Sequence, residues 1–133
     1  MTQNKLNRIL KDHKDWIEGR GGKRADLRGA DLHRADLRRA DLQGAYLQRA
    51  DLWEADLRGA DLQGAYLWEA DLQRAKLQEA NLQGANLLET KLQEANLQGA
   101  NLQRADLTNA DLTNVYLIAA NLGDCIIFYN RSE

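Results

Sequence analysis

The sequence of 133 residues contains no proline and only one cysteine, Cys125. A lone cysteine excludes a disulfide within the chain, and the absence of proline is consistent with a backbone that is hydrogen-bonded throughout. No apolar run reaches the length of a signal-peptide core or a membrane span, so we expect a cytoplasmic protein without a membrane partner. The net charge of −2 gives no strong bias towards nucleic acid.

Residues that support catalysis are also scarce. The histidines are His13 and His33, and the only serine is Ser132, close to the C-terminus. The sequence lacks a glycine-rich phosphate loop, a Cys/His metal-binding spacing and a credible serine nucleophile. His13 falls among apolar residues, where we expect a packed side chain and not a ligand. These gaps predict a protein that is not an enzyme and that has no cofactor or metal.

One five-residue phrase is abundant and runs from Ala25 to Tyr129: Ala, then mostly Asp or Asn, then Leu, then two variable residues. Leucine occupies every fifth position from Leu27 to Leu122, which makes 20 leucines, and Ile127 takes the next place. In an α-helix five residues advance about 500°, so these leucines would point in all directions. In a flat strand successive leucines would alternate between the two faces. The period therefore excludes both regular structures.

A solenoid satisfies the pattern, because a bend in every repeat turns Ala and Leu inward again. Gly44, Gly64 and Gly84 recur every twenty residues, which indicates four repeats per turn. The recurrence of residues 77–87 at 92–102 favours fifteen instead, and we give it less weight. A twenty-residue step also stacks side chains of alternating charge. These side chains are Arg34, Glu54, Arg74 and Glu94.

The repeated residues resemble the motif of the pentapeptide-repeat family, which is Ala, Asp or Asn, Leu and two free positions. The resemblance covers 21 repeats, from Ala25 to Tyr129. It implies an all-β solenoid, a right-handed quadrilateral β-helix of about five coils. We expect the departures from the motif to leave the fold intact. They are Thr90, Val115 and Cys125 in the Ala place, and Tyr46, Tyr66, Lys76, Lys91, Tyr116 and Ile126 in the Asp/Asn place.

The chain divides into residues 1–24, the repeats at 25–129 and a tail at 130–133. The first segment predicts a capping α-helix and a glycine turn, with Gly19 placed to end the helix. We expect the helix to cover the open first coil. A membrane-surface helix is disfavoured because acidic residues interrupt its polar face. The apolar face comprises Leu6, Ile9, Leu10, His13, Trp16 and Ile17.

The outward-facing residues of each repeat are expected to stabilise the local backbone as well as to provide any binding surface. The Asp or Asn before each Leu is expected to hydrogen-bond to nearby backbone at the corners. The position before each Ala holds Gly in some repeats and charged residues such as Arg34 and Glu54 in others. Because Arg and Glu replace Gly there, we predict that this corner does not require a positive φ.

Aromatic residues mark a possible partner surface. Tyr46 and Tyr66 would share one side of the solenoid, with Trp68 in the adjoining column and Trp53 on the next side. Exposed Tyr and Trp are enriched at protein interfaces, which favours binding of a protein partner. The alternative is that these rings only stack on one another between coils.

The C-terminal repeats predict a second surface. Ile126 and Phe128 should face outward, and with Ile118 and Tyr129 they form a possible dimer end. Cys125, in the Ala place, should point inward as a small apolar side chain. Exposed apolar residues beside an open coil suggest burial against another surface. We predict end-to-end homodimerisation through this last coil, an arrangement that some relatives in the family use. The alternative is a tail that folds back over the core.

The function predicted from these features is that of a non-catalytic binding or scaffold module with an unidentified protein partner, of bacterial and most closely cyanobacterial type. The alternative, implied by the resemblance, is a mimic of DNA that binds a DNA-processing enzyme such as DNA gyrase. Arginines that interrupt the acidic sides, such as Arg28, Arg38 and Arg58, weaken that alternative. Direct binding of nucleic acid through these arginines is disfavoured by the interleaved Asp residues.

Overall fold

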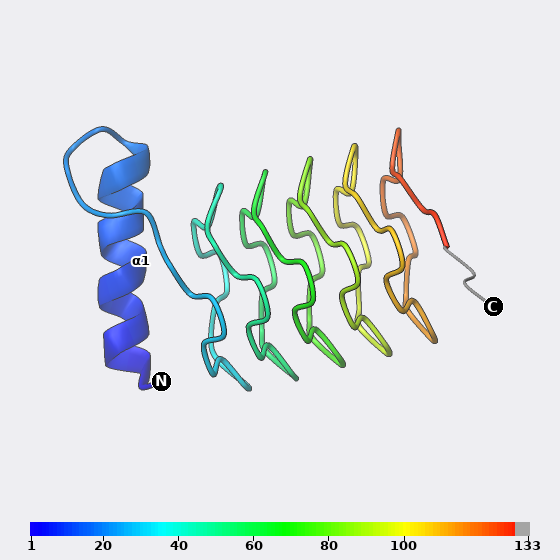
Figure 1. The fold of residues 1–133 in the computed structure, drawn as a ribbon, viewed down its shortest axis with the longest axis horizontal. Helices are drawn as coiled ribbons and strands as arrows, with labels where there is room; N and C mark the ends of the chain where they lie inside the picture. The colour runs from blue at the N-terminus through cyan, green and yellow to red at the C-terminus, as the bar shows by residue number, and fades with distance from the viewer. Residues whose placement is uncertain (130–133) are drawn as a thin grey trace.

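The computed structural model describes residues 1–129. Helix α1 (Gln3–Ile17) lies across one end of a stack of turns that begins at Ala25, and the last described residues lie at the opposite end of the stack (Figure 1). None of the described residues forms a helix that is long and apolar enough to cross a membrane. The tail at 130–133, and with it the predicted alternative of a tail folded over the core, lies outside the described residues.

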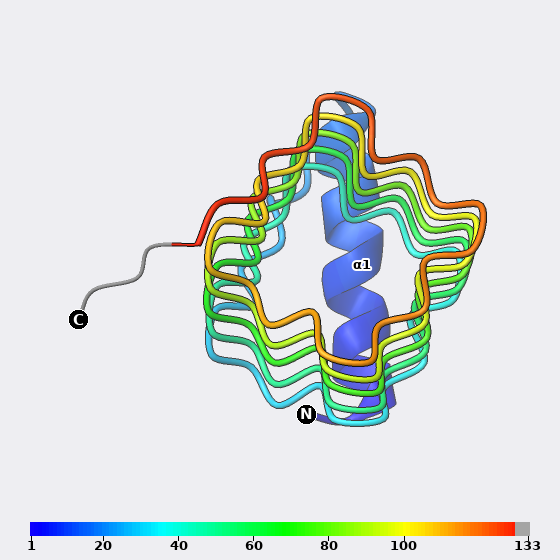
Figure 2. The same ribbon diagram turned by 90° about the vertical axis from the view of Figure 1, so that its right-hand side faces the viewer.

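Parallel bridges join each turn of the solenoid to the next. Each links a residue in the Asp/Asn place to the residue twenty positions later, from Asp26 with Tyr46 to Asp106 with Ile126. This register confirms four repeats, or twenty residues, per turn and excludes a turn of fifteen residues. Figure 2 shows the turns stacked in register. Within residues 1–129 the bridges are isolated, so each repeat contributes one bridge residue followed by a turn.

Three backbone hydrogen bonds recur in successive repeats. In the first, the Leu27 N–H donates to the carbonyl of Tyr46 at 2.7 Å. In the second, the Gly29 N–H donates to the carbonyl of Gln48 at 2.9 Å, and in the third the Tyr46 N–H donates back to Ala25 at 3.0 Å. Because a buried backbone group without a partner is costly, this network fixes the register of every turn.

Alanine and leucine fill the core, as predicted. The leucines at the centre of each repeat, from Leu27 to Leu107, are at most 2% exposed. Thr90 in an Ala place is also buried, and its Oγ1 donates to the carbonyl of Leu87 at 2.7 Å, so this departure from the motif is satisfied locally. Burial is lost towards the C-terminal end, where Leu122 is 38% exposed.

The Asp and Asn side chains form the predicted hydrogen bonds at the corners. The Oδ1 of Asp51 accepts from the backbone N–H of Trp53 at 3.1 Å. Asn81 accepts in the same way from Gln83 at 3.1 Å. The carboxylate or amide thus bonds to the backbone two residues further on, which stabilises the turn that follows each bridge.

The prediction about φ at the last repeat position was wrong. Arg34 has φ of +57° and Glu54 has +54°, close to the +66° of Gly44. The turn places this residue so that its N–H donates to the next coil, and only the left-handed region provides that geometry. Non-glycine residues can adopt this region at a cost of about 1–2 kcal/mol, which the intercoil bonds offset. Free substitution of Gly by Arg or Glu was therefore not evidence against a positive φ.

Helix α1 ends just before Gly19, as the sequence predicts, and Thr2 caps its start. The Thr2 hydroxyl accepts from the Lys5 N–H at 3.2 Å, and Gly19 follows the C-cap residue Glu18 with φ of +72°. Gly22 then passes close to the helix, where an added Cβ would lie 2.2 Å from the carbonyl oxygen of Asp12. A glycine is needed at that position because any side chain would collide with the helix backbone.

The helix caps the first turn with side chains that take the place of a preceding coil. Gln3 Nε2 donates to the carbonyl of Asp36 at 3.1 Å, and Gln3 Oε1 accepts from the Asp36 N–H at 3.3 Å. His13 is fully buried; its Nδ1 accepts from the Ala25 N–H and its Nε2 donates to the carbonyl of Gln43, both at 2.9 Å. These contacts confirm His13 as a packed cap residue. Trp16, in contrast, is 41% exposed.

Acidification should destabilise the cap through His13. Burial lowers the pKa of this imidazole, and a protonated ring could not accept from the Ala25 N–H. Because the pKa is lower in the folded state than the unfolded value of about 6.5, the stabilisation is complete above that pH and decreases as the pH falls below it. Urea unfolding between pH 7.5 and pH 5 measures this loss. His13→Gln should flatten the pH profile, whereas an unchanged profile would contradict the assignment; His33→Gln is the control that should retain it.

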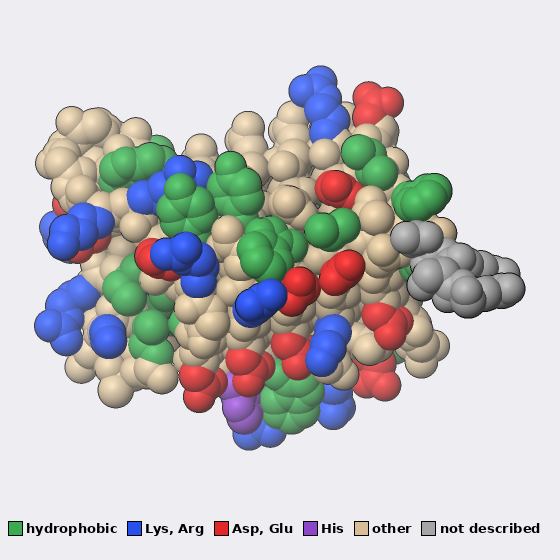
Figure 3. All heavy atoms as spheres, in the orientation of Figure 1, with side chains coloured by type: hydrophobic (Ala, Val, Ile, Leu, Met, Phe, Trp, Pro, Cys, Tyr) green, Lys and Arg blue, Asp and Glu red, His purple; other side chains and the backbone are tan. Residues whose placement is uncertain are grey.

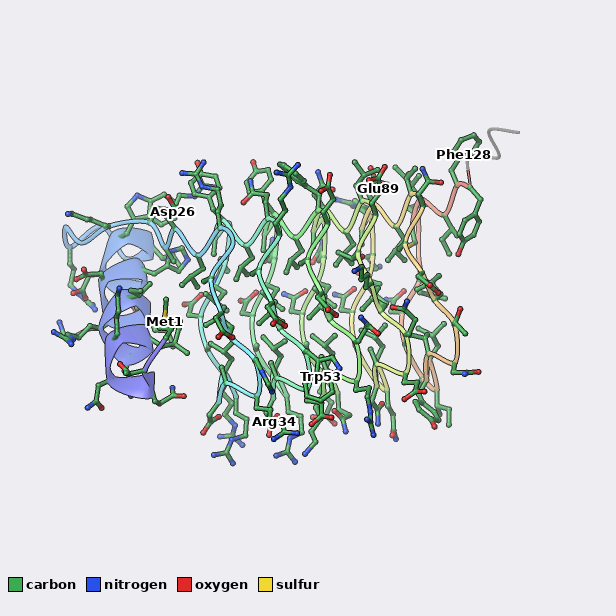
Figure 4. The ribbon with its side chains drawn as sticks, turned by 60° about the horizontal axis from the view of Figure 1, so that its bottom comes forward. Met1, Asp26, Arg34, Trp53, Glu89 and Phe128 are labelled. Carbon is green, nitrogen blue, oxygen red and sulfur yellow. The ribbon has the colours of Figure 1, made fainter. Side chains whose placement is uncertain are left out.

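Replacing a charged corner residue with glycine should stabilise the solenoid. Glu89 has φ of +57° and is exposed, and Figure 4 shows its side chain at the outer edge of the rod. Glu89→Gly removes the strain of the left-handed conformation at some cost in chain entropy, so the free energy of unfolding should rise by about 0.5–1 kcal/mol. Glu89→Ala keeps the strain and should change stability little. Equal effects of the two substitutions in urea unfolding would argue against strain at this corner.

Candidate interaction surfaces

Three of the four aromatic residues singled out from the sequence lie on neighbouring columns. The rings of Tyr46 and Tyr66 stack with centroids 5.5 Å apart. Trp68 follows Tyr66 by two residues, and the Arg49 guanidinium lies 5.2 Å from its ring centroid. We refer to Tyr46, Tyr66 and Trp68 as the aromatic face. Figure 3 shows hydrophobic side chains interleaved with Lys and Arg on the surface beside α1.

Arg24 joins this face to helix α1, a connection that the sequence analysis missed. Its guanidinium lies 4.1 Å from the Tyr46 ring centroid and 5.1 Å from that of Trp16. It also donates to the Tyr46 hydroxyl at 2.8 Å and, through Nε, to the carbonyl of Gly44 at 2.6 Å. These cation–π contacts and hydrogen bonds therefore give Tyr46 a structural role at the junction of the solenoid with helix α1. Tyr66, which is 37% exposed, and the half-buried Trp68 remain accessible.

Trp53 lies elsewhere, with different neighbours. The His33 ring meets it edge-on at 5.0 Å, and the Arg34 guanidinium lies 5.3 Å from its centroid. Figure 4 shows Trp53 and Arg34 on the edge of the rod opposite Asp26. The four aromatic candidates thus form two separate groups, as their columns in the sequence predicted.

The charged side chains of the solenoid largely pair with one another. Arg28, Arg38 and Arg58 each bind the carboxylate two residues before them, at 2.7, 2.8 and 2.6 Å. The hydrogen bond from Arg38 lowers the pKa of Asp36 to about 2. The predicted alternating column also forms, since Arg34 binds Glu54 at 3.1 Å and Arg74 bridges from Glu54 at 3.5 Å to Glu94 at 3.4 Å. Exposed pairs of this kind add little stability individually, but they neutralise the acidic rows.

A shallow cleft lies on the charged side of the rod, and its lining shows no catalytic arrangement. Its volume is about 580 Å³, and its lining combines cations such as Arg38 and Lys76 with the carboxylates of Asp36 and Asp56. The lining contains no histidine, cysteine or hydroxyl side chain. Cys125, half-buried beside the core as predicted, has its pKa raised by burial, which is opposite to the shift expected of a reactive thiol.

The C-terminal end of the rod is open in the described residues. Ile118, Ile126, Phe128 and Tyr129 are 70%, 52%, 60% and 54% exposed. The N–H groups of Leu117 and Leu122 have no backbone acceptor within residues 1–129, although the equivalent groups of earlier turns donate to the next coil. This end therefore presents both apolar side chains and unpaired backbone donors.

Comparisons with known proteins agree with this geometry. Residues 23–53, 55–93 and 90–127 match the family model for pentapeptide repeats. A pentapeptide repeat protein from Nostoc Pcc 7120 is 36% identical over 90% of this chain and 94% of its own, with a TM-score of 0.69. One from the cyanobacterium Cyanothece 51142 is 42% identical over 69% of this chain and 63% of its own length, with a TM-score of 0.68. The comparison with curated proteins found no match.

Proposed function

Since the chain belongs to the pentapeptide repeat family, we propose that it is a non-catalytic module that binds a protein partner through the aromatic face. The observation that carries this proposal is the accessibility of Tyr66 and Trp68 on one side of a hydrogen-bonded rod. Tyr and Trp provide most of the binding energy at many interfaces. We also propose, from the family resemblance, that the solenoid is right-handed and quadrilateral and has about five coils.

The rod suits such a role because its surface is organised before binding. Backbone hydrogen bonds of 2.7–3.0 Å hold successive turns together, so little conformational entropy remains to be lost when a partner docks. Arg49 beside Trp68 is already paired with Glu69 at 2.9 Å. Arg24 beside Tyr46 is in no ion pair among residues 1–129, and its charge favours a partner whose docking segment carries carboxylates beside apolar side chains.

Mimicry of DNA, with a target such as DNA gyrase, is the less favoured function. A mimic requires an acidic surface with an uncompensated field. Here Arg28 neutralises Asp26, Arg38 neutralises Asp36, and the alternating column balances its own charges. A supercoiling assay with DNA gyrase separates the two functions, because a binding module of the proposed kind leaves supercoiling unchanged.

We propose in addition that a second copy of the chain covers the C-terminal end. The last turn offers the donors of Leu117 and Leu122 together with carbonyl groups such as that of Ala120, so two copies related by a two-fold axis can supply one another's partners. Apolar burial of Ile126 and Phe128 would stabilise the pair. Charged residues, in contrast, cover the other end of the rod on helix α1.

The aromatic face is tested by a double substitution, Tyr66→Ser with Trp68→Ser, which spares Tyr46 because of its contacts with Arg24. A protein captured from a lysate of the source organism should bind the double variant at least about tenfold more weakly, since truncation of an interface aromatic costs about 2 kcal/mol or more. Calorimetric titration of the captured partner measures the change. Trp53→Ser, on another side, is the matched control, and equal losses in both variants would contradict the assignment.

Self-association is tested by Ile126→Asp with Phe128→Asp. The native chain of 15.0 kDa should sediment as a dimer at micromolar concentration, because burial of the exposed apolar end favours association. The double variant should sediment as a monomer, while the Trp53→Ser protein stays dimeric. A native monomer at every concentration would refute the proposal, as would a dimer that survives the double substitution.

A further inference from the structure

Three side chains with metal-binding groups converge on one side of the first two turns. Asp31 and Asp51 are joined across the turns by a parallel bridge, and His33 follows Asp31 by two residues. One ligand atom from each lies within 4.8 Å of the others. We propose that Asp31, His33 and Asp51 form a surface site for a divalent transition-metal ion, with Zn²⁺ as the best match.

The ligand atoms of this cluster are available. The Oδ1 of Asp31 accepts from the His33 N–H at 3.3 Å, and that of Asp51 from the Trp53 N–H at 3.1 Å, which orients both carboxylates. Within the described residues, no hydrogen bond or ion pair engages the Oδ2 atoms of Asp31 and Asp51. Asp71, the next residue in the column, differs because its Oδ2 accepts from Gln73 Nε2 at 3.2 Å.

The electrostatics of the column favour a cation. Like charges placed opposite one another on neighbouring strands are destabilising, and Asp31 and Asp51 are stacked in this way. In the stack of Asp36 and Asp56 arginine compensates the charge, as Arg58 does for Asp56 at 2.6 Å. Arg34 does not do so here, because it pairs with Glu54 at 3.1 Å. The N-terminal ammonium of Met1 donates to the Asp31 carbonyl at 3.4 Å, but among residues 1–129 no ion pair reaches the carboxylate of Asp31 or Asp51. A bound divalent ion would supply that direct counter-charge.

The donor set selects among divalent ions. It consists of one imidazole nitrogen and two carboxylate oxygens, which suit Zn²⁺, whereas Ca²⁺ and Mg²⁺ take oxygen ligands. Bonds of about 2.1 Å in a tetrahedral site require ligand atoms about 3.4 Å apart, so the ligands must approach one another by small rotations of surface side chains. The edge-on contact with Trp53 at 5.0 Å holds the His33 ring beside the carboxylates. The three residues leave a fourth position for water.

Binding would link the first turn to the second. Because the ligands come from both turns, the folded chain presents them together and the unfolded chain does not. Metal should therefore stabilise the fold by mass action, independently of any protein partner. The site lies away from the aromatic face, so its test does not depend on the proposed function.

The experiment is a titration of the untagged full-length protein with ZnCl₂ at pH 7.5, by calorimetry and by thermal unfolding. The native chain should bind one Zn²⁺ and unfold at a higher temperature with Zn²⁺ than without it. His33→Gln and Asp51→Asn should each weaken Zn²⁺ binding by about tenfold or more, because each removes a ligand. CaCl₂ at the same concentration should have no comparable effect on unfolding.

Two matched control variants test whether Zn²⁺ binds at Asp31, His33 and Asp51 and not elsewhere on the chain. Asp71→Asn changes the same column at a carboxylate already bound by Gln73, and should retain full Zn²⁺ affinity. Cys125→Ser removes the only thiol and should also retain it. The proposal is overturned if the native chain binds no Zn²⁺ up to millimolar concentration. It is equally overturned if His33→Gln binds as tightly as the native protein, or if binding is lost with Cys125→Ser.

Discussion

The register of backbone hydrogen bonds between turns is the constraint on which the rest of the structure depends. Each repeat must present the N–H of its Leu and of its last residue to the coil that follows, and the N–H of its bridge residue to the coil before. Five residues meet this requirement only by including a left-handed corner. The corner is therefore imposed on Arg34 and Glu54 as much as on Gly44. Leucine and alanine point inward as a consequence, and the core extends as a column without interruption.

The same constraint makes the two ends of the rod special, because a terminal turn has donors and acceptors with no neighbour. At the first turn, Gln3 and His13 of helix α1 supply amide-like groups that replace the missing coil. The described C-terminal turn has no equivalent cover, and its leucines become progressively exposed. This difference between the ends is the physical basis for placing self-association at the C-terminal end.

Between the ends, the fold permits almost any residue at the outward positions, so their identity reports on surface chemistry. Most charges are used locally, in Arg–Asp pairs within a repeat and in the alternating column between turns. Two places stand out for their side chains. One is the aromatic face, where Tyr66 and Trp68 remain accessible. The other is the stack of Asp31 and Asp51, where His33 lies beside two carboxylates that form no ion pair among residues 1–129. Function is therefore sought at these two places.

The sequence by itself determined the solenoid, the inward Ala and Leu, the cap and the separation of Trp53 from Tyr46, because a period of five residues admits few packings. It did not reveal the positive φ of the corners, since side chains there face solvent and any residue can accept the strain. The roles of Trp16 and Arg24 also required the tertiary structure, which alone places the helix against the first turn. The spacing of residues along the chain did not predict the cluster of Asp31, His33 and Asp51, because only the twenty-residue register brings these side chains together.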